Sequence, residues 1–300
     1  MSKERILITG ANGNLGGALV KELADNTPYE VIAVSSDQAK IYDMLERECV
    51  IHRERVTSMN SDTFFHTNWS DLGVFACVHM AFSRANQSKE RIAASLDFSK
   101  NVYRRLHEMS VPRIVYLSSQ SVYGAISEWR SEDCAAAPES VYSMAKYAGE
   151  KLLEAEFTGS QTEFSILRLD YVIQSQNLVP VLCRSAKETG TIRLQGGKQT
   201  FSYIDKSDVA KAIIALLDYN GPWQRVYNVG HDHMRYSLQE VADIVAKVAE
   251  KDGKNKISIS LEENDTILWA GMDSARFMSD TGWHPLMDLY QMVEEIYKKN

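Results

Sequence analysis

Residues 5–17, RILITGANGNLGG, decide the fold of this chain. The apolar stretch Arg5–Thr9 predicts a short buried strand, and helical periodicity follows over residues 16–25. Between them Gly10, Gly13 and Gly16 make a tight turn. Where such a turn connects a strand to a helix, the backbone N–H groups at the helix N-terminus can approach a pyrophosphate closely. The position of this glycine turn therefore predicts a dinucleotide site.

Composition indicates a soluble globular protein with a large core. The 300 residues are 44% hydrophobic and 24% charged, and the formal net charge is −7. This charge argues against a broad surface for nucleic acid or for anionic membranes. The N-terminal apolar run is too short for a signal peptide. The longest apolar-rich stretch, residues 73–82, falls far below the roughly 20 residues that a membrane span needs. No membrane association is expected.

The cysteines and histidines suggest neither disulfides nor a metal site. Cys49, Cys77, Cys134 and Cys183 are scattered with no close pair, which is typical of reduced thiols in a cytoplasmic protein. His231 and His233 lie two apart near a predicted strand end, where a solvated turn is the better interpretation. We expect no metal.

The first half of the chain alternates short apolar runs with amphipathic stretches, which predicts a parallel sheet covered by helices. Further strands are predicted at residues 29–35, 74–81, 113–118 and 164–169, and helices at 92–109 and 142–157. Residues 41–71 show no clean period, and a third strand is placed only roughly at 50–57. Beyond Leu169 the alternation loosens, and the predicted elements are a helix at 207–219, a strand at 225–230 and a helix at 237–251.

The end of the second strand usually separates NAD from NADP, because an acid there binds the adenosine ribose and repels a 2′-phosphate. Here Ser35 and Ser36 occupy that point, with Asp37 beyond them and Lys40 as the nearest cation in the sequence. A phosphate has room, but no arginine follows to bind it. The choice between NAD and NADP stays open.

A tyrosine and a lysine four apart share one helix face, where the ammonium and a nicotinamide charge could lower the phenol pKa for proton transfer. The chain has two such pairs, Tyr142/Lys146 and Tyr147/Lys151. Tyr142 opens its helix and follows Ser119, which ends the strand RIVYLS, where ligands collect in open parallel sheets. The first pair is therefore the predicted site, and Tyr147 is predicted to be a packing residue.

These pieces resemble the extended short-chain dehydrogenase/reductase family, the NAD-dependent epimerase/dehydratase group. The matching segments, in order, are TGANGNLGG at 9–17, VHMA at 78–81, VPRIVYLSSQSVYG at 111–124, PESVYSMAKYAGE at 138–150, ILRL at 166–169, QTFSYIDKSDVAKAI at 199–213, RVYNVG at 225–230 and TGWHP at 281–285. Their order and spacing together make the resemblance specific.

The resemblance implies a Rossmann-like, doubly wound parallel sheet with a smaller C-terminal α/β substrate lobe. The dinucleotide domain would comprise residues 1–170 and about 196–230, and the lobe about 171–195 and 231–300. Ser119 would orient the substrate oxygen, Tyr142 would be the acid/base, and Lys146 would bind the ribose. The implied cofactor contacts are Gly10, Gly13, Asn14, Leu15, Gly16, Ser35, Ser36, Met80, Ala81, Ser118, Tyr142 and Lys146. The implied substrate contacts are Ser119, Gln120, Tyr171 and Gln199.

Two departures from the family pattern leave the substrate open. Tyr171 stands where many nucleotide-sugar enzymes have asparagine, and Gln199 stands where they use an arginine for the diphosphate. Charge-assisted bonds to phosphate are strong, so the missing arginine matters. Gln120 and Ser121 beside Ser119 disfavour dehydration, which needs an acidic pair.

Three functions remain. The leading one is hydride chemistry on a secondary alcohol or ketone of a sugar, whether a nucleotide sugar or another sugar derivative. The second is a dehydrogenase or reductase for a small non-nucleotide carbonyl or uronate. The third is a non-catalytic protein that senses NADP. We expect a cytoplasmic homodimer, with the helices at 92–109 and 142–157 at the interface, and no nucleic-acid partner.

Overall fold

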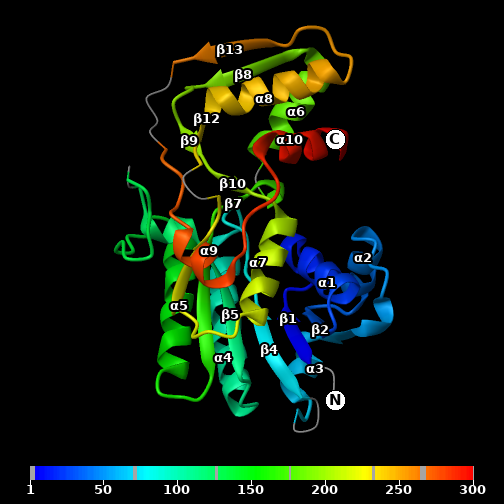
Figure 1. Cartoon of the computed structure of the whole chain (residues 1–300), viewed down its shortest axis with the longest axis vertical. Helices are drawn as coiled ribbons and strands as arrows, with labels where there is room; N and C mark the ends of the chain where they lie inside the picture. Colours follow the sequence, from blue (N-terminus) through cyan, green and yellow to red (C-terminus); the bar gives the residue numbers. More distant parts are fainter. Residues whose placement is uncertain are drawn as a thin grey trace.

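A computed structural model describes residues 4–69, 73–125, 128–175, 177–231, 234–263 and 268–299. Its centre is a sheet of seven parallel strands (Figure 1). In spatial order these are β11 (Val226–Val229), β6 (Glu163–Leu169), β5 (Arg113–Ser119), β4 (Val74–His79), β1 (Arg5–Thr9), β2 (Glu30–Ser35) and β3 (Val56–Asn60). The predicted doubly wound sheet is confirmed. The strand order reverses between β1 and β4, where ligands bind in such sheets.

Helices cover both faces of the sheet. One core contains apolar residues of α1 (Asn14–Asn26), α2 (Ala39–Arg47) and α7 (Lys206–Asp218). The core on the other face contains residues of α3 (Ser61–His66), α4 (Lys89–Glu108) and α5 (Val141–Phe157). Figure 1 shows α4 and α5 side by side, in line with their close packing. The predicted homodimer would use these two helices, and it stays a prediction.

The prediction of a third strand at residues 50–57 is wrong in its position. Residues Arg53–Arg55 form a 3-10 turn, η1, and the strand begins only at Val56. The apolar signal came from Val50, which is buried at the end of α2 and packs in the core. Helix α2 itself buries Ile41, Met44 and Leu45, the i, i+3, i+4 spacing of one helix face.

A second group of elements lies beyond the carboxyl ends of the strands, in the upper part of Figure 1. It contains α6 (Leu178–Thr189), α8 (Leu238–Lys251) and α10 (Leu289–Lys299), with β8 (Thr191–Gln195) paired in parallel with β13 (Ser258–Glu262). These elements share a hydrophobic core of their own.

Two short strand pairs join this group to the sheet. They are β7 (Tyr171–Val172) with β10 (Tyr203–Ile204), and β9 (Thr200–Phe201) with β12 (Tyr236–Ser237). Helix α9 (Ala275–Thr281) returns to pack on β11, and its Phe277 belongs to the core of the sheet. We propose that the two lobes divide along these cores. None of the described helices is both long and apolar enough to cross a bilayer.

Candidate active site

The glycine turn after β1 leaves no room for side chains. Gly10 has φ +73°, and a Cβ there would lie 2.8 Å from the Cα of Ala81. At Gly16 a Cβ would collide with the Gly10 carbonyl oxygen. Helix α1 begins after Gly13 without a side-chain cap and without an acid in its first turn. Its N-terminal N–H groups are therefore available to an anion, and the bare backbone fits a pyrophosphate.

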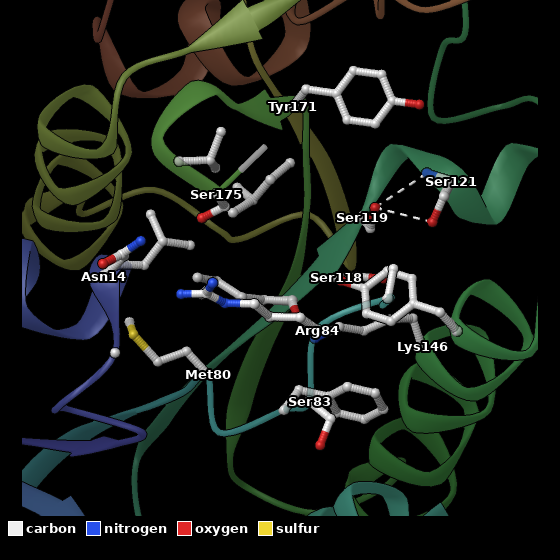
Figure 2. A pocket seen from close by; sticks show the side chains of 18 of the residues that line it. Asn14, Met80, Ser83, Arg84, Ser118, Ser119, Ser121, Lys146, Tyr171 and Ser175 are labelled. Atoms are coloured by element: carbon white, nitrogen blue, oxygen red, sulfur yellow. Dashed lines mark hydrogen bonds between the residues drawn. The ribbon is translucent and has the colours of Figure 1, made fainter. Parts of the chain in front are cut away.

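A cavity of about 460 Å³ opens above this turn. Figure 2 shows Asn14 and Met80 on one side of it, Ser118 and Lys146 on another, and Tyr171 at the far end. Most of the predicted site residues line this cavity: Gly10, Gly13, Asn14, Leu15, Gly16, Met80, Ser118, Ser119, Tyr142, Lys146 and Tyr171. Segments that lie more than 150 residues apart in the sequence thus meet at the reversal point of the sheet.

Ser119 lies where β5 ends and the 3-10 turn η2 (Gln120–Tyr123) begins. Its hydroxyl oxygen accepts hydrogen bonds from the Ser121 amide, at 3.2 Å, and from the Ser121 hydroxyl, at 3.0 Å (Figure 2). The turn thereby fixes the Ser119 side chain while its own O–H remains able to donate.

Tyr142 occupies the first turn of α5, which a capping box between Ser140 and Ser143 starts. The ring lies edge-on to Phe82, with centroids 6.1 Å apart. Burial raises the pKa of Tyr142 to about 12, and a hydrogen bond with the Ser119 hydroxyl acts in the opposite direction. The phenol is therefore protonated in the protein alone. The lowering of its pKa predicted from the Lys146 ammonium together with a nicotinamide charge is not present in the protein alone, and for the enzyme with bound cofactor it stays a prediction.

Lys146 is one turn further along α5, with a side chain that is almost fully buried. Its Nζ donates to the Leu117 carbonyl at 2.7 Å and lies 4.2 Å from the centre of the Phe82 ring. Burial lowers the pKa of Lys146 to about 7, while the negative charge of Glu150 raises it. The charge of this lysine is therefore sensitive to its surroundings near neutral pH.

The rival pair occupies a different face of α5. Tyr147 packs beside Val122, Tyr123 and Met272, and Lys151 Nζ lies 5.1 Å from the centre of the Tyr147 ring. Neither residue lines the cavity.

Below Lys146, a buried ion pair joins α5 to β6. Glu150 is fully buried and accepts from Arg168 Nη2 at 2.7 Å and from Arg168 Nε at 3.1 Å. The Ser118 hydroxyl donates to the same carboxylate. Arg168 is thus a structural partner of Glu150, and Ser118 links this pair to the cavity.

A second cavity extends from the glycine turn toward the end of β2. Ser35, Ser36, Met80 and Ala81 line it, as do apolar residues of α4. The two cavities share Gly10, Gly13 and Met80, so together they form one continuous groove along the strand ends.

Two predicted substrate residues lie outside the cavities. Gln120 is buried and bridges the Asp170 carboxylate and Arg130 Nη1, the latter at 2.7 Å. Gln199 lies between β8 and β9, where its Nε2 donates to the Gln195 carbonyl at 3.0 Å. Their assignment to the substrate stays a prediction, and so does that of Tyr171, which does line the cavity.

Arg84 and Asp170 line the main cavity, and no sequence motif pointed to them. Arg84 follows β4, and Figure 2 shows its guanidinium inside the cavity on the side of Asn14 and Met80. Asp170 follows β6. Its oxygens accept from Gln120, from the Ser202 hydroxyl and from the Tyr171 amide. Burial raises the pKa of Asp170 to about 6. Asp170 directly follows the end of β6, whereas Arg84 lies in the loop five residues beyond the end of β4.

In the described part of the chain, no group of three or more His, Cys, Asp or Glu side chains could hold a metal ion. His231 Nε2 contacts the Met287 carbonyl oxygen at 2.9 Å. His233 lies outside the described residues.

Comparison with known proteins identifies the family. The profile of the NAD dependent epimerase/dehydratase family matches residues 6–230, three quarters of the chain. The chain belongs to this family. It is an NAD(P)-dependent enzyme of the extended short-chain dehydrogenase type, as the sequence predicts.

Individual relatives are distant in sequence but match nearly the whole length of the chain. The dTDP-L-rhamnose 4-epimerase of Burkholderia thailandensis is 23% identical, over 98% of this chain and 94% of that protein. The structure of UDP-glucuronic acid 4-epimerase from Bacillus cereus with NAD superposes with a TM-score of 0.80 at 18% identity, covering 98% and 99% of the two chains. For UDP-glucose 4-epimerase from Thermotoga maritima the TM-score is 0.79 at 18% identity, covering 98% and 97%. These structures share the fold.

Proposed function

We propose that the protein epimerises a secondary-alcohol carbon of a sugar through a transient ketone. One observation carries the proposal: Ser119, Tyr142 and Lys146 line the same cavity as the glycine turn. A phenol, a hydroxyl and an ammonium beside a dinucleotide site are the groups that proton-coupled hydride transfer needs.

When bound, the nicotinamide ring supplies the hydride acceptor and donor. The residues of the chain handle the proton and the geometry. Ser119 donates its O–H to the reacting sugar oxygen in place of Tyr142, because Ser121 already supplies its acceptor contacts. Tyr142, as the phenolate that has released its own proton to solvent, takes the hydroxyl proton as the ketone forms and returns it when the alcohol is restored. Lys146, once protonated and rotated from the Leu117 carbonyl toward the ribose, favours the phenolate electrostatically.

The proposed substrate class is a sugar linked to a nucleoside diphosphate. The Bacillus cereus relative has been crystallised with UDP-glucuronic acid and NAD, and the Burkholderia relative acts on a dTDP-sugar by name. Arg84 adds a guanidinium to the groove, where it would neutralise diphosphate charge. Arg84 would compensate in part for the absence of an arginine at position 199.

A panel of UDP- and dTDP-sugars, incubated with the purified full chain, tests the proposal by proton NMR. The proposal predicts a change in configuration at one ring carbon of at least one sugar, with no net change in absorbance at 340 nm. The absence of any epimer, together with net oxidation of reduced cofactor, would refute epimerisation.

A reductase for a small carbonyl compound is the second candidate. The placement of Gln199 outside the cavity favours it, since no cation stands at the position where many relatives anchor the diphosphate. Steady consumption of reduced cofactor with uronates or simple ketones in the same assay would support this candidate instead.

A further inference from the structure

The groove near the end of β2 has an unusual lining for an NAD-dependent enzyme. Ser35, Ser36 and Ser61 contribute hydroxyl groups, and Arg91 contributes a cation from α4. No carboxylate occurs among the described residues that line this cavity. An acid at this point would bind both ribose hydroxyls and exclude a 2′-phosphate, so its absence removes the usual barrier to NADP.

Asp37, the nearest carboxylate in the sequence, makes a local hydrogen bond at the start of α2 and does not line the cavity. Asp37 Oδ1 accepts a hydrogen bond from the Ala39 amide at 3.0 Å, at the start of α2. Ser35 fixes this loop, because its hydroxyl donates to the Asp37 carbonyl and accepts from the Asp37 amide. Asp37 does not line the cavity, whereas the exposed Ser36 does.

Helix α2 brings two cations to the rim of this cavity. Lys40 Nζ lies 3.5 Å from the hydroxyl oxygen of Ser36. Arg47, at the other end of the helix, donates from Nη2 to the Asn12 carbonyl at 3.2 Å. Asn12 and Ser36 both line the cavity, so each of the two cations contacts a residue of its lining.

The close approach of α2 depends on Gly17. A Cβ there would lie 2.9 Å from Glu48 Cγ and 3.2 Å from Arg47 Nη2. Glu48 contacts Arg47 Nε at 3.2 Å, but its carboxylate is also held by Lys206 Nζ at 2.6 Å. Two cations, Arg47 and Lys206, thus share the one carboxylate of Glu48. The sequence shows no arginine near Ser36, yet the fold brings Arg47 to the glycine turn.

We propose that the cofactor of this enzyme is NADP(H), its 2′-phosphate bound between Ser36 with Lys40 and Asn12 with Arg47. This inference rests on the proposed dinucleotide site. A phosphate dianion gains charge-assisted hydrogen bonds from both side chains, and the serine hydroxyl adds a donor. NAD would leave both cations without that partner.

Isothermal titration calorimetry of the full chain with NADP⁺ and NAD⁺ measures the preference directly. NADP⁺ is expected to bind at least about tenfold more tightly, the value of roughly one good charged hydrogen bond. Equal or tighter binding of NAD⁺ would overturn the inference and leave the proposed function standing. Binding of neither dinucleotide would overturn both.

Variants assign the preference to its residues. The double variant Lys40→Ala/Arg47→Ala should lose at least about tenfold in NADP⁺ affinity and less than about threefold in NAD⁺ affinity. Lys256→Ala, an exposed lysine on the upper lobe, is the matched control and should change neither. In Ser36→Asp the new carboxylate should weaken NADP⁺ binding and strengthen NAD⁺ binding. Equal losses for both dinucleotides in the double variant would contradict recognition of the 2′-phosphate.

Discussion

Replacing Glu150 by glutamine is expected to have two effects, one on the stability of the protein and one on the pH dependence of catalysis. The side chain keeps its shape but loses the charge that balances Arg168, whose side chain is only 6% exposed. Breaking a buried ion pair on one side costs about 3–5 kcal/mol, because the remaining charge stays buried without a partner. With unfolding entropy of about 2.1 cal/mol/K per residue, a chain of this length should melt roughly 5–8 °C lower.

The same substitution acts on Lys146. The negative charge of Glu150 raises the pKa of Lys146, which burial lowers to about 7. Without that charge the pKa falls further, and a smaller fraction of the lysine is protonated at neutral pH. If protonated Lys146 supports catalysis, the alkaline limb of the kcat/KM profile should move to lower pH.

Differential scanning calorimetry and a pH–rate profile of Glu150→Gln test both parts. Glu295→Gln is the matched control, because its ion pair with Lys299 is exposed and should contribute less than about 1 kcal/mol. A melting temperature equal to that of the wild type would refute the ion-pair argument. An unshifted alkaline limb in a destabilised variant would refute the link to Lys146.

Three further perturbations follow from the geometry. Burial lowers the pKa of His79 to about 3, so on acidification the unfolded chain binds a proton at this histidine before the folded chain does. The unfolding free energy should therefore fall by a few kcal/mol between pH 6.5 and 3. Chemical denaturation at several pH values should show a smaller fall in the unfolding free energy for His79→Asn. Gly16→Ala places a Cβ against the Gly10 carbonyl and should weaken dinucleotide binding at least about tenfold by calorimetry; unchanged affinity would contradict the tight turn. Arg84→Ala should raise KM for a nucleotide sugar about tenfold with a smaller effect on kcat, as a binding role requires; a loss confined to kcat would contradict that role.

Local sequence signals predict the sheet well because its strands are buried on both faces and its first turn needs glycine. Arg5–Thr9 and Arg113–Ser119 are continuous apolar runs, which parallel strands require. The upper lobe was predicted only in outline. Its α6 and α10 were not predicted, and the exposed strand β13 carries only a weak apolar pattern.

The catalytic candidates could be predicted for a similar reason. Ser119 ends a core strand and Tyr142 opens a helix, so local pattern places both at the strand ends. Arg47 could not be found that way, because its approach to the glycine turn depends on the packing of α2 against Gly17. Arg84 carries no motif either, and only the folded cavity identifies it.

The most direct test of the central claim is Tyr142→Phe. The variant keeps the ring that packs against Phe82 and removes only the hydroxyl that would carry the proton. Dinucleotide affinity and epimerase turnover should be measured on the same preparation. The account predicts affinity within about threefold of the wild type and a loss of at least about 100-fold in kcat. Turnover near the wild-type rate would contradict the role of Tyr142 as acid and base.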